Sequence, residues 1–144
     1  MTIEKTIKLL MLIAKDQPGA ANQQLAAAVI YKNQIISIGF NSYKSHPFAA
    51  KFSKSPDAIY LHAETDAIYK ATKRLSKEEL KKSTIVIVRH KQKITNHKKQ
   101  YLSDIYGSAK PCIGCQKCIN EYGFKKVIYT NDSDHLSFTT VIGK

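Results

Sequence analysis

Four side chains in this sequence combine the ligands of a metal ion with a proton acceptor: His62, Glu64, Cys112 and Cys115. Thiolates and a neutral imidazole are ligands that zinc takes in proteins, and three protein ligands leave the fourth tetrahedral position open for catalysis. A carboxylate beside such a position can take a proton from water and pass it on. The four residues therefore predict a zinc centre that carries out hydrolytic chemistry.

The spacing of these residues is compatible with a single metal ion. Cys112 and Cys115 are three positions apart, which places both on one side at the start of a helix. Pro111 suits the entry to that helix, and a helix N-terminus favours the thiolate over the thiol. Glu64 follows His62 too closely to be a convenient fourth ligand, so we expect it to reach the water at the metal.

Cys118 leaves open an alternative in which His62 and three cysteines hold a structural zinc. Cys118 lies deeper in the helix than the first-turn pair, and joining it to the same ion would strain the helix. We therefore expect Cys118 to be a packed thiol. A Cys-x-x-Cys pair taken alone is also compatible with a redox motif.

The composition indicates one soluble domain over residues 1–144, since 43% of the residues are hydrophobic. No apolar run is long enough to cross a membrane, and the run after Lys8 is too short for a signal peptide. Clustered cysteines differ from a spread disulfide framework and favour the reducing cytoplasm. The net charge of +12 favours anionic partners, either nucleotides or nucleic acid.

Hydrophobic patterns and turn residues predict the order of the elements. They are a helix over 3–15, a hairpin of strands 25–31 and 34–40, a long loop over 41–57, a helix from His62 to about Leu75, a helical piece over 76–82 that begins with a Ser76–Glu79 capping box, a strand over 84–88, a helix over 111–122 ended by Gly123, and strands over 126–130 and 136–142. The basic segment 89–99 is either a strand extension with a hairpin or a surface loop, and its place beside the metal motif also suits a lid or a phosphate-binding surface. This order predicts an α/β sandwich with a mixed sheet, and the motifs fall where strands lead into helices.

His62-x-Glu64 followed by Pro111-Cys112-x-x-Cys115 matches the signature of zinc-dependent nucleobase deaminases. The chain thereby resembles the cytidine and deoxycytidylate deaminase superfamily, which includes deaminases of tRNA and of polynucleotides. The resemblance implies a three-layer α/β sandwich whose central, mixed, five-stranded sheet has helices on both faces. It implies Zn²⁺ held by His62, Cys112 and Cys115, with Glu64 as the catalytic proton shuttle.

The resemblance also implies contacts to the substrate. The backbone N–H near Ala63 is similar in position to the group that contacts the base in family members. The carbonyl of Lys110 is similar to the group that accepts a hydrogen bond from the exocyclic amine of the base. Asn41 is similar to an asparagine that holds the sugar or base, although an asparagine here equally suits a turn with a local hydrogen bond. Family members usually assemble, so a homo-oligomer is expected.

Two clues disagree on the branch of the family. The segment after Thr130 is too short for a crossover helix and a strand, which favours an antiparallel last strand, as in the branch that acts on free cytidine. His-Ala-Glu, in contrast, resembles the branch that contains deoxycytidylate and tRNA deaminases.

Three functions follow from these patterns. The first is deamination of the cytosine of a free nucleotide, dCMP-like, with lysines and Arg89 on the phosphate. The second is deamination of cytosine or adenine within tRNA or single-stranded DNA. Aromatic residues that could stack on bases alternate with lysines after the second strand and support this function: Tyr43, Phe48, Phe52 and Tyr60. The third is a zinc-stabilised binding protein, against which the intact Glu64 argues.

Overall fold

A mixed sheet of six strands forms the centre of the protein in a computed structural model. The structure describes residues 2–16, 24–41, 62–96 and 101–143, without the side chains of 93–96 and 101–103. The strands are β1 (Gln24–Tyr31), β2 (Gln34–Phe40), β3 (Thr84–Asn96), β4 (Tyr101–Gly107), β5 (Lys126–Thr130) and β6 (Phe138–Ile142). Their order is β2-β1-β3-β5-β6, and β4 pairs with β3 outside this path. Only β3 and β5 are parallel neighbours, so the mixed sheet is confirmed with one strand more than expected.

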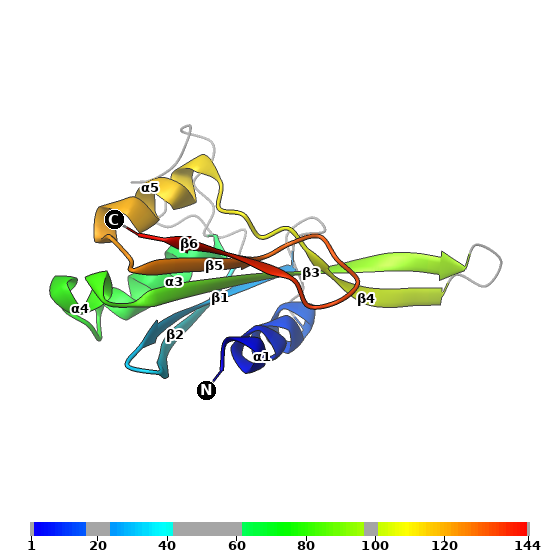
Figure 1. The fold of residues 1–144 in the computed structure, drawn as a ribbon, viewed down its shortest axis with the longest axis horizontal. Coiled ribbons are helices and arrows are strands. Elements are labelled where there is room, and N and C mark those ends of the chain that lie inside the picture. Colours follow the sequence, from blue (N-terminus) through cyan, green and yellow to red (C-terminus); the bar gives the residue numbers. More distant parts are fainter. Residues whose placement is uncertain (1, 17–23, 42–61, 97–100, 144) are drawn as a thin grey trace.

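Helices cover both faces of the sheet (Figure 1). They are α1 (Ile3–Asp16), α3 (Ala63–Thr72), α4 (Lys77–Lys81) and α5 (Ile113–Tyr122). One core lies between α1 and the sheet, and the other between the sheet and the remaining helices. Strands β1 and β3 contribute alternate residues to the two cores, which explains why their sequences are almost continuously apolar. No helix in the described ranges is long and apolar enough to span a bilayer.

The first hairpin has the turn that its sequence predicts. Lys32 and Asn33 join β1 to β2, and both have positive φ angles, 50° and 64°. A two-residue turn with both φ values positive matches the right-handed twist of the strands. The pairing of Ala28 with Ile38 continues the ladder away from this turn. The expected antiparallel hairpin is thus confirmed.

Residues 89–96 of the basic segment extend β3, and β4 runs beside them to form a hairpin that projects from the body (Figure 1). Of the two expectations for this segment, strand extension is confirmed. The base of the hairpin is held by His90, which is 2% exposed. Its Nδ1 lies 2.6 Å from Gln24 Oε1 and its Nε2 lies 2.8 Å from Asp104 Oδ1, while Lys15 Nζ lies 2.6 Å from Asp104 Oδ2. These contacts join the base of the hairpin to α1 and β1.

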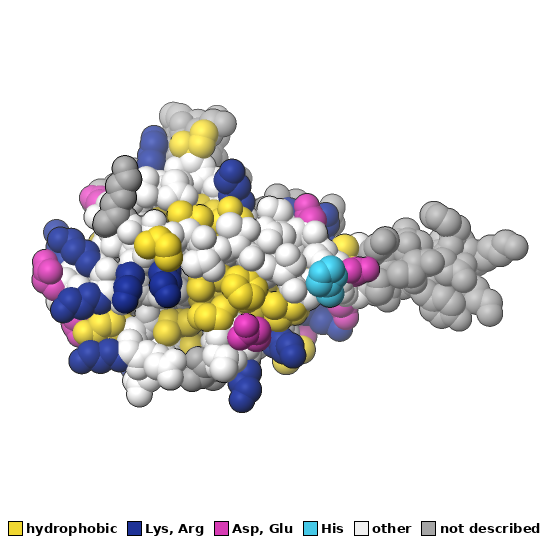
Figure 2. Space-filling model, in the orientation of Figure 1, with side chains coloured by type: hydrophobic (Ala, Val, Ile, Leu, Met, Phe, Trp, Pro, Cys, Tyr) yellow, Lys and Arg dark blue, Asp and Glu magenta, His cyan; other side chains and the backbone are white. Residues whose placement is uncertain are grey.

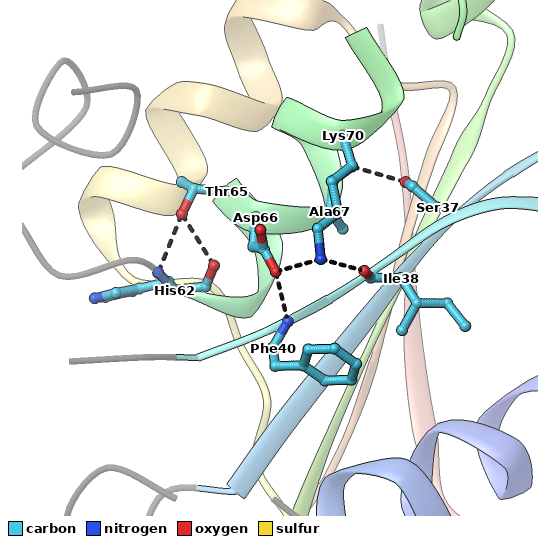
Figure 3. A network of polar contacts seen from close by, with 8 residues as sticks. All are labelled: Ser37, Ile38, Phe40, His62, Thr65, Asp66, Ala67 and Lys70. Carbon is cyan, nitrogen blue, oxygen red and sulfur yellow. Dashed lines mark hydrogen bonds and ion pairs between the residues drawn. The ribbon is translucent and has the colours of Figure 1, made fainter. Parts of the chain in front are cut away.

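Helix α3 packs directly on β2, through contacts drawn in Figure 3. The Ser37 hydroxyl donates to the carbonyl of Ala67 at 2.7 Å, and Asp66 Oδ2 accepts the N–H of Phe40 at 3.0 Å. Gly39 makes this approach possible, because a Cβ there would lie 2.3 Å from the nitrogen of Ala67. No real side chain fits at that distance, so the backbones of helix and strand are in contact.

Helix ends differ from the expectations by a few residues. α3 runs over Ala63–Thr72 with His62 as N-cap, which is shorter than predicted, and α5 begins at Ile113 with Cys112 as N-cap. Pro111 therefore lies before the cap and not in the first turn, because the cysteine takes the capping position. Gly123 ends α5 with φ 67°, as expected for a left-handed cap.

The remaining local expectations fall into two groups. The Ser76–Glu79 capping box at the start of α4 and the antiparallel pairing of β6 with β5 are confirmed. The long loop over 41–57 lies outside the described residues beyond Asn41.

Gly39→Ala should destabilise the protein by at least about 1–3 kcal/mol, because the added methyl group collides with the α3 backbone, which cannot rotate away. Thermal or urea unfolding measures the loss. Gly107→Ala is the matched control, because a Cβ there meets flexible side-chain carbons of Lys91 and Arg89. Equal stability of the two variants would show that α3 does not depend on this contact.

Candidate metal centre

His62, Cys112 and Cys115 come together at the N-termini of α3 and α5. Their ligand atoms all lie within 4.8 Å of one another. Nδ1 of His62 lies 3.2 Å from Sγ of Cys115 and 3.6 Å from Sγ of Cys112. The structure thus assembles the three side chains that the sequence singled out, although they come from segments about fifty residues apart in the chain.

Thr65 fixes the backbone of His62 (Figure 3). Its Oγ1 accepts the N–H of His62 at 3.1 Å and donates to the carbonyl of His62 at 3.0 Å. The same carbonyl accepts the N–H of Asp66 at 2.9 Å, the first hydrogen bond of the helix. The histidine therefore stands at a defined point of a helix start that is itself anchored to β2.

The cysteine pair occupies the start of α5. Cys112 is the N-cap residue, and its sulfur accepts the N–H of Cys115 at 3.4 Å. The backbone before the pair is tied to the sheet, since the N–H of Ala109 donates to the carbonyl of Thr130 at 2.9 Å. A free N–H and the positive end of the helix dipole both favour a thiolate at this position.

The two thiols and the imidazole share protons in a way that suits a metal ion. Hydrogen bonds with Cys115 and, second, with His62 lower the pKa of Cys112 to about 3. The pKa of Cys115 is raised, first by its hydrogen bond with Cys112 and then by burial, while the hydrogen bond with Cys112 raises the pKa of His62. Cys112 is thus the thiolate of the pair, and a bound cation would take the place of the remaining proton.

The donor set fits zinc in number, type and spacing. Bond lengths of about 2.3 Å to sulfur and 2.0–2.1 Å to nitrogen, at tetrahedral angles, put ligand atoms about 3.6 Å apart. The distances from His62 Nδ1 to the two sulfurs, 3.2 and 3.6 Å, lie close to this value. Three ligands leave one tetrahedral position for water or substrate.

A family model for the zinc-binding region of cytidine and deoxycytidylate deaminases matches residues 1–131. The chain belongs to this family. It is similar in fold to the dCMP deaminase of cyanophage S-TIM5 in complex with dCMP and dUMP, at 23% identity over 92% of this chain and 85% of that chain, with a TM-score of 0.57. The apo form of the phage enzyme gives 25% identity over 93% and 88% of the two chains, with a TM-score of 0.53. A search of curated proteins finds no significant match.

Family membership identifies the chain as a zinc-dependent hydrolytic deaminase, and His62, Cys112 and Cys115 are positioned to hold the zinc. The non-enzymatic interpretation, a zinc-stabilised binding protein, is thereby set aside.

Glu64 lies in the first turn of α3 and is only 4% exposed. Burial raises its pKa, while its own backbone N–H, the charge of His62 and a hydrogen bond with the Cys115 thiol act in the opposite direction. A carboxyl group with a raised pKa is a better proton acceptor near neutral pH than an exposed one. The deaminase thus holds a buried carboxyl group against the ligand cluster.

The residues expected to bind substrate have different surroundings. Ala63 is buried at the first position of α3, where a backbone N–H has no partner within the helix, and Lys110 lies two residues before Cys112. Asn41 Oδ1 accepts the N–H of Leu25 at 3.1 Å, which is the local hydrogen bond of the simpler interpretation. Its contact to substrate stays a prediction, as do the substrate contacts of Ala63 and Lys110.

Sequence reasoning did not single out the residues that hold the ligands in place. Thr65 follows His62 at the spacing of a capping box, which was a usable signal, whereas a lone Gly39 in a strand carries little information. Cys118 is fully buried in the core with Ile119 and does not join the metal group formed by the described residues.

Cys118→Ala should retain one zinc per chain, and Cys115→Ala should lose it. The first change removes a sulfur from the apolar core at a cost of about 1–2 kcal/mol, whereas the second removes a ligand. Metal analysis of the purified variants measures the difference. Loss of zinc from a folded Cys118→Ala protein would instead support the four-ligand structural site.

Proposed function

We propose that this enzyme deaminates the cytosine of a free deoxynucleoside monophosphate, dCMP-like, to the uracil product and ammonia. The observation that carries the proposal is the buried Glu64 carboxyl group beside the three-ligand cluster, with a cationic side chain, Arg89, on the same face of the sheet. The fold similarity to a dCMP deaminase crystallised with dCMP and dUMP supports the choice of substrate.

We assign the following roles at the reacting base as part of this proposal. Bound zinc supplies Lewis acidity that makes a water molecule nucleophilic near neutral pH. Glu64 takes the proton of the attacking water and delivers it to the ring nitrogen, and a later proton goes to the departing amine, so that water and cytosine give uracil and ammonia. The N–H of Ala63 and the carbonyl of Lys110 hold the base, and Asn41 holds the sugar.

Arg89 is our candidate for the phosphate. By strand alternation, its side chain lies on the same sheet face as Ile85 and Ile87, which belong to the core under α3 and α5. Its Nε is buried and has no hydrogen-bond partner within the described part of the chain. An arginine with an unsatisfied donor is well suited to phosphate oxygens.

Lys91 is a neighbouring cation on the same face as Arg89, but an acid already engages it. Lys91 Nζ lies 3.5 Å from Asp132 Oδ1. That carboxylate also accepts the N–H of Ser108 at 3.0 Å, a hydrogen bond that contributes most to lowering its pKa. The charge of Arg89 also lowers the pKa of Asp132, but the buried Nε of Arg89 has no hydrogen-bond partner among the described residues, so Arg89 is the better candidate of the two for the phosphate.

A second substrate class, a base within tRNA or single-stranded DNA, is favoured by the net charge of +12 and by the projecting β3–β4 hairpin (Figure 1). A basic arm of this kind can follow a phosphate backbone. The aromatic residues that would stack with bases, Tyr43, Phe48, Phe52 and Tyr60, lie outside the described residues.

We also infer a cytoplasmic location and a homo-oligomeric state. Two thiol ligands must stay reduced to hold zinc, and none of the three cysteines forms a disulfide. Oligomers are common among soluble enzymes, most often with two-fold symmetry.

Ammonia release from dCMP, cytidine, dCTP and single-stranded oligonucleotides separates the two substrate classes. We expect turnover of the monophosphate and little of cytidine, because the phosphate contact contributes binding energy that the nucleoside lacks. Turnover of oligonucleotides with no activity on any mononucleotide would exclude the first substrate class.

Arg89→Gln should raise KM for dCMP roughly ten- to hundredfold, as expected for loss of a charge-assisted hydrogen bond, and should leave kcat/KM for deoxycytidine almost unchanged. Steady-state kinetics on both substrates gives the comparison. Arg74→Gln is the matched control, since Arg74 donates to the carbonyl of Ile36 at the far edge of the sheet. An equal effect on nucleoside and nucleotide would mean that Arg89 does not contact the phosphate.

Glu64→Gln should lower kcat by about 10²–10⁴-fold and retain zinc, because the amide keeps the shape of the carboxyl group but accepts no proton. Activity and metal content are measured on the same preparation. Glu78→Gln is the control, as Glu78 is an exposed carboxylate on α4. Wild-type turnover by the Glu64→Gln enzyme is incompatible with the assigned proton transfer.

A further inference from the structure

The two edges of the sheet differ in how their backbone groups are satisfied. At the β2 edge, Lys70 Nζ donates to the carbonyl of Ile38 at 3.1 Å and Arg74 donates to the carbonyl of Ile36 at 2.9 Å. Asp66 accepts the N–H of Phe40 at that edge (Figure 3). Cationic side chains and occupied backbone groups of this kind prevent another strand from pairing.

The β6 edge has none of these features among the described residues. Its sequence, Phe-Thr-Thr-Val-Ile, has no charge and no proline. Among the described strands, β6 pairs with β5 alone. Val141 and Ile142 are 47% and 64% exposed. Figure 2 shows hydrophobic surface across the middle of this face, along β6 and between β6 and α1. A flat, uncharged and apolar edge of this kind favours pairing with another strand.

The ladder with β5 identifies which backbone groups face outward. Gly143 N–H donates to the carbonyl of Lys125 at 2.7 Å, and Asn131 N–H donates to the carbonyl of Ser137 at 3.0 Å. Both lie in the register that pairs Val127 with Val141. Because hydrogen-bonded and non-hydrogen-bonded pairs alternate, the N–H and C=O groups of the even-numbered residues point to the open edge. These residues are Phe138, Thr140 and Ile142.

We propose that β6 is the interface for a second copy of this chain, which pairs antiparallel to it across a two-fold axis near Thr140. This pairing sets Phe138 of one copy opposite Ile142 of the other and Thr139 opposite Val141. Each of these pairs is uncharged, and the two sheets become one. The proposal names a surface for the expected homo-oligomer and holds for either class of substrate.

The charges beside β6 favour a second copy over another partner. The turn before β6 carries two exposed acidic side chains: Asp134, which is 76% exposed, and Asp132, which is 66% exposed and also faces Lys91 of its own chain. The strand's other end lies beside Lys125 and Lys126. Antiparallel pairing places the acidic turn of one copy next to the lysines of the other, twice by symmetry. Two chains of net charge +12 repel each other overall, so an edge that sets acidic side chains against lysines is a favourable approach.

Ile142→Lys tests the interface by sedimentation velocity over a range of concentrations. We expect the wild type to form a dimer or an even-numbered oligomer, and the variant to dissociate at least about tenfold more readily, because pairing would bury an unpaired ammonium group. Leu12→Lys is the matched control, because Leu12 on α1 is also 64% exposed, and it should assemble as the wild type does. Zinc content and circular dichroism verify that both variants fold.

Amide hydrogen exchange of the wild-type protein tests the same surface without a substitution. The N–H groups of Phe138, Thr140 and Ile142 should become protected as the concentration rises, while those of Thr139 and Val141 stay protected throughout. A monomeric wild type would overturn both the interface and the expected oligomer. An oligomer that Ile142→Lys leaves intact, or that Leu12→Lys disrupts equally, would overturn the interface alone. Each result is independent of which substrate the enzyme deaminates.

Discussion

The contact between α3 and β2 at Gly39 is the constraint on which the metal centre depends. His62 directly precedes α3, so the position of its imidazole follows from where this helix begins. The parallel connection through α5 brings the cysteine pair to the same end of the sheet, since β3 and β5 run in one direction. The N-termini of α3 and α5 thus meet at one end of the strands, where the helix dipoles favour a thiolate and a carboxylate.

Burial of the Glu64 carboxyl group is energetically unfavourable. A carboxyl group that is 4% exposed loses hydration, and its raised pKa reports that loss. Replacement by an apolar residue would relieve this cost and would also remove the proposed proton acceptor. The fold is anchored strongly nearby, through Thr65 on His62 and Ser37 on Ala67, so the site can hold an unfavourable group in place.

The chemistry-bearing residues were predictable from sequence because their types and spacing are constrained by the metal itself. His62, Cys112 and Cys115 were expected as ligands before any fold was known, and the structure brings them together. The hairpin of β3 and β4 was only one of two expectations for the segment 89–99, because this polar segment has no apolar period that distinguishes a hairpin from a surface loop. Gly39 was missed for a different reason, since a close approach between backbones leaves no trace in a hydrophobic pattern.

The helix that positions His62 also closes one edge of the sheet. The outward-facing backbone N–H and C=O groups of β2 are occupied by side chains from α3 and from just after it: Asp66, Lys70 and Arg74. In the described part of the chain no such helix lies beside β6, because β5 and β6 are joined by a turn over 131–137 and not by a helical crossover. A turn makes the last strand antiparallel and leaves its outer groups open. The connection that sets the direction of β6 thereby also sets where a second chain can add to the sheet.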